Sequence, residues 1–164
     1  MHIRDEQPAD KEAIFRLTAA AFELMPYSDG SEPVIIDKLR ENGDLALSLV
    51  AVDGGEVVGH IAFSPVTING VADHWFGLGP VSVKPEKQRN GIGSKLVLAG
   101  LDWLKSHGAN GCVLVGDPDY YARFGFKSDG NLSYGDVPTE FVQWLSFDGK
   151  SPVGVIIYSP AFEA

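Results

Sequence analysis

Residues 79–101 read GPVSVKPEKQRNGIGSKLVLAGL, and the rest of the chain can be arranged around this stretch. Val81 and Val83 alternate with polar residues as in a strand, a polar loop follows, and Gly91 and Gly93 stand at the start of a predicted helix. The first N–H groups of a helix have no intrahelical partner and carry partial positive charge, so they can bind an anion. The stretch therefore predicts a cradle for a phosphate or diphosphate.

The glycine pair alone is a weak signal, because an ordinary strand–turn–helix joint also needs small residues. Two better-defined phosphate motifs are excluded. A P-loop needs GxxxxGK followed by Ser or Thr, whereas Gly93 is followed by Ser94 and Lys95. A dinucleotide fingerprint needs a third glycine where this chain has Leu96.

Composition indicates an ordinary globular chain. Its 164 residues are 45% hydrophobic and 21% charged, which predicts one domain spanning residues 1–164. The sequence has no apolar run of about 18 residues, so we expect no membrane-spanning helix. The first ten residues do not resemble a signal peptide, and the single cysteine permits no internal disulfide, so we expect a cytoplasmic protein.

The net charge of −9 argues against a nucleic-acid partner, whose binding depends on clustered Lys and Arg. We expect no membrane partner either. An acidic surface is compatible with a cationic substrate such as an amine, although it also simply keeps a protein in solution. Basic residues nevertheless gather locally within twelve positions, as an anionic ligand would require: Lys84, Lys87, Arg89 and Lys95.

Hydrophobic periodicity and turn signals predict a mixed chain of helices and strands. The helices are expected at residues 8–22, 32–42, 91–107 and 117–124. The strands are expected at 2–5, 45–52, 57–68, 71–83, 111–115, 141–147 and 153–158, with another beginning at 126–128.

Three of these strands should form an antiparallel meander, because turn signals at 53–56 and 69–70 join them. Gly79 and Pro80 weaken ladder pairing and predict a bulge in the third strand. The strand–helix–strand order implies that 81–83 and 112–115 run parallel, and that their C-terminal ends splay beyond the bulge.

Two motifs together resemble the GNAT family of N-acetyltransferases. The first is Val81-Ser82-Val83-Lys84-Pro85-Glu86 followed by Gln88-Arg89-Asn90-Gly91-Ile92-Gly93, similar to the acetyl-CoA-binding motif of that family. The second is Tyr120-Tyr121-Ala122-Arg123-Phe124-Gly125-Phe126, similar to a helix ending in Tyr-x-x-x-Gly-Phe. The resemblance implies an α+β (mixed α/β) fold: a central, mostly antiparallel sheet of about seven strands, flanked by about four helices, with splayed parallel strands in the middle.

The resemblance implies acetyl-CoA as co-substrate and no metal. Unpaired backbone groups beyond the bulge could pair with the amides of pantetheine like an added strand. The resemblance places the coenzyme contacts on Val81, Ser82, Val83, Gln88, Arg89, Asn90, Gly91, Ile92, Gly93, Ser94, Asp117 and Tyr121.

Catalytic roles follow from the chemistry of acyl transfer. The Val81 N–H beyond the bulge is the candidate donor to the oxyanion. Tyr121 matches the tyrosine of the family motif and is the candidate general acid, with Tyr120 as fallback; either could instead be a core aromatic. The general base is left open among His60, His74, Glu32 and Asp117, and Asp117 could instead cap its helix.

The expected activity is direct transfer of an acetyl group from acetyl-CoA to a primary amine of a small molecule, peptide or protein. The alternative is an acyl-CoA-binding sensor or interaction module without catalysis. We expect the acceptor pocket to be built by the first two helices and the loop 130–138, and a homodimer through 153–158 is plausible. Cys112 is interpreted as a core residue.

Overall fold

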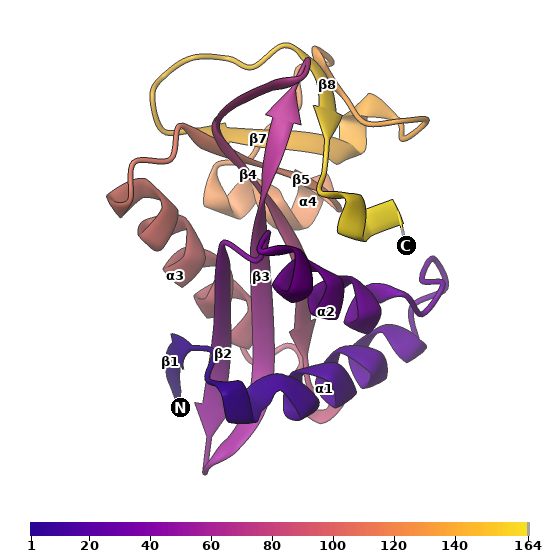
Figure 1. Ribbon diagram of the computed structural model, residues 1–164, viewed down its shortest axis with the longest axis vertical. Helices are drawn as coiled ribbons and strands as arrows, with labels where there is room; N and C mark the ends of the chain where they lie inside the picture. Colours follow the sequence, from indigo (N-terminus) through magenta and orange to yellow (C-terminus); the bar gives the residue numbers. More distant parts are fainter. Residues whose placement is uncertain (164) are drawn as a thin grey trace.

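The computed structural model describes residues 1–163, in which eight strands form the centre and four α-helices cover it (Figure 1). The strands are β1 (His2–Asp5), β2 (Leu47–Asp53), β3 (Glu56–Ile68), β4 (Val71–Val83), β5 (Gly111–Val115), β6 (Leu132–Ser133), β7 (Val142–Ser146) and β8 (Gly154–Ile157). The helices are α1 (Lys11–Glu23), α2 (Glu32–Asn42), α3 (Ile92–Ser106) and α4 (Pro118–Tyr121), and short 3-10 turns lie at Pro8–Asp10, Pro85–Lys87, Ala122–Phe124, Thr139–Phe141 and Pro160–Glu163.

The sheet runs in the order β1-β2-β3-β4-β5-β7 and is antiparallel except between β4 and β5. β8 pairs with the end of β3 and, in parallel, with β6. The predicted α+β fold is confirmed. The loop expected at 130–138 contains one strand that was not predicted, the two-residue β6. The strand expected to begin at 126–128 is wrong, since only Lys127 makes an isolated bridge, to Trp144.

Side chains alternate between the two faces of the sheet, and each face carries its own helices (Figure 1). On β2, Val50 and Val52 pack against Ile14 of α1 and Ile36 of α2. The intervening Ala51, with Leu47 and Leu49, belongs to the core beneath α3. Burial of each large aliphatic side chain stabilises the fold by roughly 1.5–3 kcal/mol, so both helical layers are held by their apolar stripes.

The predicted bulge lies in β4, where the strand changes register against β3. Ile61 faces Val81 and Phe63 faces Leu78, so Gly79 and Pro80 together lie opposite a single residue. Gly79 has φ of +130°, which glycine tolerates and other residues rarely adopt. The bulge therefore bends β4 just before the Val81–Val83 segment.

β4 and β5 pair only over three residues, from Trp75–Gly77 to Gly111–Val113. Beyond that point β5 continues beside β7, and β4 continues beside β3. The predicted divergence of two parallel neighbours is confirmed, and it opens the middle of the sheet.

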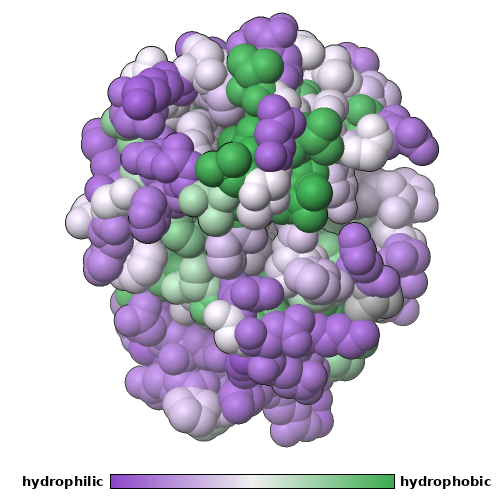
Figure 2. All heavy atoms as spheres, turned by 45° about the horizontal axis from the view of Figure 1, so that its top comes forward, coloured by the Kyte–Doolittle hydropathy of each residue, from purple (hydrophilic) through white to green (hydrophobic). Residues whose placement is uncertain are grey.

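Apolar side chains also remain uncovered at one end of the molecule. Figure 2 shows apolar residues gathered on the face that brings forward the top of Figure 1, where β8 and the tip of the β3–β4 hairpin lie. Val155 and Ile157 of β8 are about half exposed, as is Val71 at the start of β4.

Candidate active site

A cleft of about 1330 Å³ occupies the space between the diverging strands. One end lies at the N-terminus of α3, and the other lies at the C-terminal end of α1 and the loop after it. Eleven of the twelve predicted coenzyme contacts line it: Val81, Ser82, Val83, Gln88, Arg89, Gly91, Ile92, Gly93, Ser94, Asp117 and Tyr121.

Asn90 is the exception. Its side chain turns back and donates from Nδ2 to the Lys87 carbonyl, 3.3 Å away. It therefore holds the shape of the loop and is not a wall of the cleft.

The backbone of β4 presents hydrogen-bonding groups to this cleft. The Lys84 N–H donates to the Val58 carbonyl of β3 at 2.8 Å. Because backbone groups alternate in direction along an antiparallel strand, Ser82 also turns its N–H and carbonyl to β3, and Val81 and Val83 turn theirs to the cleft. The Val83 carbonyl accepts from Gln88 Nε2 at 3.1 Å. The Val81 N–H is left facing the cleft.

The start of α3 forms the other polar wall. Gly91 precedes the helix with φ of +81°, and the first turn carries no acidic side chain. The first N–H groups of the helix, at Ile92, Gly93 and Ser94, lie before the first intrahelical bond, from Lys95 to Gly91. This end of the cleft therefore has the open helix N-terminus that the predicted anion site requires.

The basic residues in and near the loop have two different surroundings in the described part of the chain: some are held in ion pairs, and others are free of them. Lys84 is bound by Glu56 and Glu86, which neutralise it. Within residues 1–163, Lys87, Arg89 and Lys95 make no ion pair, and Arg89 lines the cleft. Local positive charge is therefore available where the helix N–H groups are.

The two neighbouring tyrosines have different surroundings. The Tyr120 hydroxyl lies 3.1 Å from Ser94 Oγ, and the Arg123 guanidinium lies 4.4 Å above its ring. The Tyr121 ring packs on Gly116, where a Cβ would approach Tyr121 Cε2 to 2.7 Å. Burial, followed by the charges of nearby groups, raises the pKa of Tyr121 well above its usual range. Tyr121 is therefore a protonated hydroxyl at the cleft.

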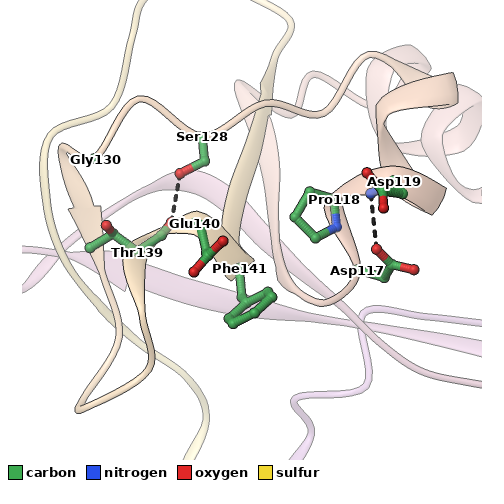
Figure 3. Close-up of a pocket in the computed structure, with 8 residues that line it drawn as sticks. All are labelled: Asp117, Pro118, Asp119, Ser128, Gly130, Thr139, Glu140 and Phe141. Atoms are coloured by element: carbon green, nitrogen blue, oxygen red, sulfur yellow. Dashed lines mark hydrogen bonds between the residues drawn. The ribbon is translucent and has the colours of Figure 1, made fainter.

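Asp117 caps α4, because its Oδ1 accepts from the Asp119 N–H at 2.9 Å. This is the helix-cap role that the sequence offered as the alternative to a general base. Figure 3 shows this bond beside a second pocket of about 620 Å³, into which Glu140 also projects. The pocket adjoins the cleft, because Asp117 and Phe141 line both. Its polar wall is acidic.

The other residues considered from the sequence lie elsewhere. His74 is exposed near the start of β4, and Glu32 accepts from Ser28 Oγ at 2.6 Å at the start of α2. Cys112 is fully buried, which raises the pKa of its thiol and confirms its core role. His60 is fully buried in β3.

Several cleft residues escaped the sequence analysis, because no motif marks them. At the α1 end the walls are mostly apolar and come from segments far apart in the chain: Phe22, Met25, Tyr27, Val137 and Phe141. One hint of them came from the sequence: we expected the first two helices and the loop 130–138 to build the acceptor pocket.

Comparisons with known proteins agree with this geometry. Residues 11–126 match the Acetyltransferase (GNAT) family. Uncharacterized N-acetyltransferase YhbS of Escherichia coli is 41% identical over 128 residues, which cover 77% of this chain and 74% of that protein. The chain therefore belongs to the GNAT acetyltransferase family.

Two solved structures are similar over almost the whole chain. A GNAT family acetyltransferase from Brucella melitensis, in complex with acetyl-CoA, is 48% identical with a TM-score of 0.89, covering 98% of this chain and 97% of its own. YhbS from Escherichia coli, in complex with CoA, is 34% identical with a TM-score of 0.91. The similarity covers 99% of this chain and 92% of the YhbS chain.

No helix within residues 1–163 is both long and apolar enough to cross a membrane. No group of three or more His, Cys, Asp or Glu side chains is placed to hold a metal ion in the same residues.

Proposed function

We propose that this chain, as a single domain, transfers the acetyl group of acetyl-CoA directly to a primary amine. One observation carries the proposal: the cleft-facing backbone of Val81–Val83 and the open N-terminus of α3 meet in a single cleft. The acetyl-CoA and CoA complexes of the two similar structures support it.

Acetyl-CoA supplies an activated thioester. In the proposed arrangement the Val81 and Val83 backbone binds the pantetheine amides as an added strand would. The N–H groups of Gly93 and Ser94, with Arg89, bind the diphosphate. The remaining predicted contacts shape this wall, and Asn90 holds the loop in place through its bond to the Lys87 carbonyl.

Two groups are proposed to act on the reacting atoms. The Val81 N–H donates to the carbonyl oxygen as the amine nitrogen attacks and negative charge develops there, an effect worth about 3–4 kcal/mol in comparable oxyanion holes. Tyr121 then donates its hydroxyl proton to the sulfur as the C–S bond breaks. Burial raises the pKa of Tyr121, so the hydroxyl is protonated before this step.

The acceptor end of the cleft favours an amine with an apolar body. Phe22, Met25 and Phe141 supply apolar surface there, and the adjoining acidic pocket contains Asp119 and Glu140. The net charge of −9 also attracts cations at long range. These features support a cationic primary amine of a small molecule or peptide as acceptor.

A panel of primary amines tests the function. Propylamine, spermidine, an aminoglycoside and a lysine-containing peptide are each incubated with acetyl-CoA, and free thiol and acetylated product are measured. We expect stoichiometric thiol and N-acetyl product with at least one of them. Tight acetyl-CoA binding without thiol release would instead favour the alternative, a non-catalytic acyl-CoA sensor or interaction module.

A further inference from the structure

A chain of polar side chains, partly buried except for the fully buried His60, runs beneath α1 and α2, on the face of the sheet opposite α3. The Ser48 hydroxyl of β2 donates to Glu6 Oε1 at 2.8 Å, and His60 Nε2 of β3 lies 2.8 Å from Ser48 Oγ. Arg40 of α2 binds the same carboxylate through two bonds of 2.7 and 3.0 Å. His60 is fully buried.

These contacts fix which nitrogen of His60 carries the proton. Burial raises the pKa of Glu6, but hydrogen bonds from Arg40 and Ser48 outweigh it and leave the carboxyl ionised at neutral pH. An ionised carboxylate only accepts, so the single Ser48 proton points to Glu6. Ser48 Oγ must then accept from His60 Nε2–H. The other nitrogen, Nδ1, is left as a bare lone pair.

This lone pair has no partner. His60 Nδ1 is buried and makes no hydrogen bond to any described residue. Ser82 lies directly opposite His60 on β4, and its buried hydroxyl is unpartnered too. Side chains of directly opposite residues share one face of a sheet, with Cβ atoms about 5 Å apart. A single water between the two atoms would satisfy both.

Ser82 also connects His60 to the cleft. It lines the cleft between Val81 and Val83, the two residues whose backbone faces the thioester site. The other sequence-derived candidates for the base are occupied or distant: Asp117 caps α4, and Glu32 and His74 line no part of the cleft. His60 is thus the candidate whose basic atom is unpartnered and whose opposite residue on β4, Ser82, lines the cleft.

We propose that His60 accepts, through Ser82 and one bridging water, the proton that the acceptor amine loses when it attacks the thioester. The proposal rests on the acetyl transfer proposed above. As the C–N bond forms, the amine N–H bond breaks and its proton passes by way of Ser82 Oγ and the water to Nδ1. The C–S bond then breaks, and the thiolate takes its proton from Tyr121. Once product has left, the imidazolium returns its proton to water by the same path, and the Tyr121 phenolate takes up a proton from water, so both residues are restored.

The surroundings of His60 suit a transient acceptor. Burial lowers the pKa of His60 to about 4, so the imidazole is neutral and ready at pH 7. The charged groups that face it are Glu6, which stabilises the imidazolium through Ser48, and Arg40, which opposes it. The imidazolium is therefore short-lived, as a relay requires.

Three variants test the relay with the best acceptor of the amine panel. His60→Gln keeps a donor for Ser48 but has no basic nitrogen, and Ser82→Ala removes the link to the cleft. Ser64→Ala is the matched control, because Ser64 is another buried, unpartnered hydroxyl on β3 that does not line the cleft. We expect kcat to fall about 100-fold in His60→Gln, in line with the loss of a general base, and about tenfold in Ser82→Ala. The KM for acetyl-CoA should stay unchanged in both, and Ser64→Ala should match the wild type.

The pH profile separates a lost base from structural damage. In His60→Gln the deficit in kcat should shrink as the pH rises from 7 to 9.5, because hydroxide then removes the proton. A deficit that is equal at every pH, or a His60→Gln kcat equal to wild type, overturns the relay. If the wild type acetylates no amine of the panel, the proposed function fails and the relay with it.

A measurement independent of turnover uses ¹⁵N NMR of the imidazole at pH 7. We expect a protonated Nε2 and an unprotonated Nδ1, with the Nδ1 shift changed by Ser82→Ala and unchanged by Ser64→Ala. A protonated Nδ1 would overturn the relay even if amines are acetylated.

Discussion

Tyr120 and Tyr121 are adjacent in the sequence, yet their hydroxyls have separate surroundings. The Tyr120 hydroxyl is hydrogen-bonded to Ser94 at the start of α3, whereas the Tyr121 hydroxyl makes no hydrogen bond with any described residue, and Tyr121 lines the cleft. A hydroxyl without a protein partner is free to bind the leaving sulfur. The geometry thus supports the choice of Tyr121 over its neighbour as the acid.

We expect Tyr121→Phe to lower kcat about 100-fold while the Kd for acetyl-CoA and the Tm change little, because the ring and its packing are kept. Steady-state kinetics and calorimetry measure the three quantities. Tyr134→Phe is the matched control, since Tyr134 packs on Tyr158 outside the cleft. Turnover equal to wild type in Tyr121→Phe would remove Tyr121 from the mechanism.

At the scale of single elements, the first turn of α3 separates binding from folding. A methyl group at Gly93 would lie 3.5 Å from the Tyr120 hydroxyl oxygen and 3.6 Å from Val83 Cγ2, which are ordinary contacts. The folded chain therefore has room for alanine at this position. The same methyl group would stand at the helix mouth, where the diphosphate is proposed to bind.

We therefore expect Gly93→Ala to weaken acetyl-CoA binding about tenfold, or roughly 1.4 kcal/mol, without loss of stability. The free energy of unfolding should even rise by about 0.5–1 kcal/mol, because alanine is a better helix former than glycine. Isothermal titration and urea denaturation measure the two effects.

Gly100 of α3 is the contrasting control. A Cβ there would lie 2.2 Å from Phe63 Cε1, so Gly100→Ala should lower stability. An unchanged Kd in Gly93→Ala would move the diphosphate site away from this turn.

At the scale of the whole molecule, Glu6 and Arg40 join the segment after β1 to α2 across 34 positions of sequence. Both side chains are largely buried, with 13% and 17% exposed. Removing one partner leaves a poorly solvated charge on the other. This pair therefore fastens the N-terminal strand to the helical layer.

We expect Arg40→Met to lower the free energy of unfolding by about 2 kcal/mol at pH 7, somewhat less than for a fully buried pair. The folded-state pKa of Glu6 is below its unfolded value, so its contribution is present above the unfolded pKa and is lost as the pH falls through the folded one. The difference between wild type and variant should therefore shrink at pH 3.5. Urea denaturation at both pH values measures it, and an equal difference at both would contradict the assignment.

The homodimer through residues 153–158 stays a prediction, which sedimentation of the wild type would test. Val155 and Ile157 of β8 are exposed there. β8 is paired on both edges, with β3 and β6, so a partner would meet side chains and not an open strand edge.

Local chemistry let the sequence predict much of the fold. Asn69 and Gly70 have positive φ, as the hairpin turn between β3 and β4 requires, and Gly79–Pro80 breaks the register where expected. The stretch 79–101 forms the predicted strand, loop and helix. Each of these features depends on residues within a few positions of one another, so a short stretch of sequence is enough to predict it.

Contacts between distant segments were decided only by the tertiary structure. The apolar end of the cleft joins Met25 and Phe141, and the buried relay joins Glu6, His60 and Ser82, which lie on separate segments. Such neighbours depend on strand register and helix placement, which the packing of the whole core sets and no short motif records. The sequence by itself determined the strand–loop–helix stretch 79–101 and the family. The apolar end of the cleft and the polar chain of Glu6, Ser48 and His60 depend instead on contacts that only the folded sheet and its helices make.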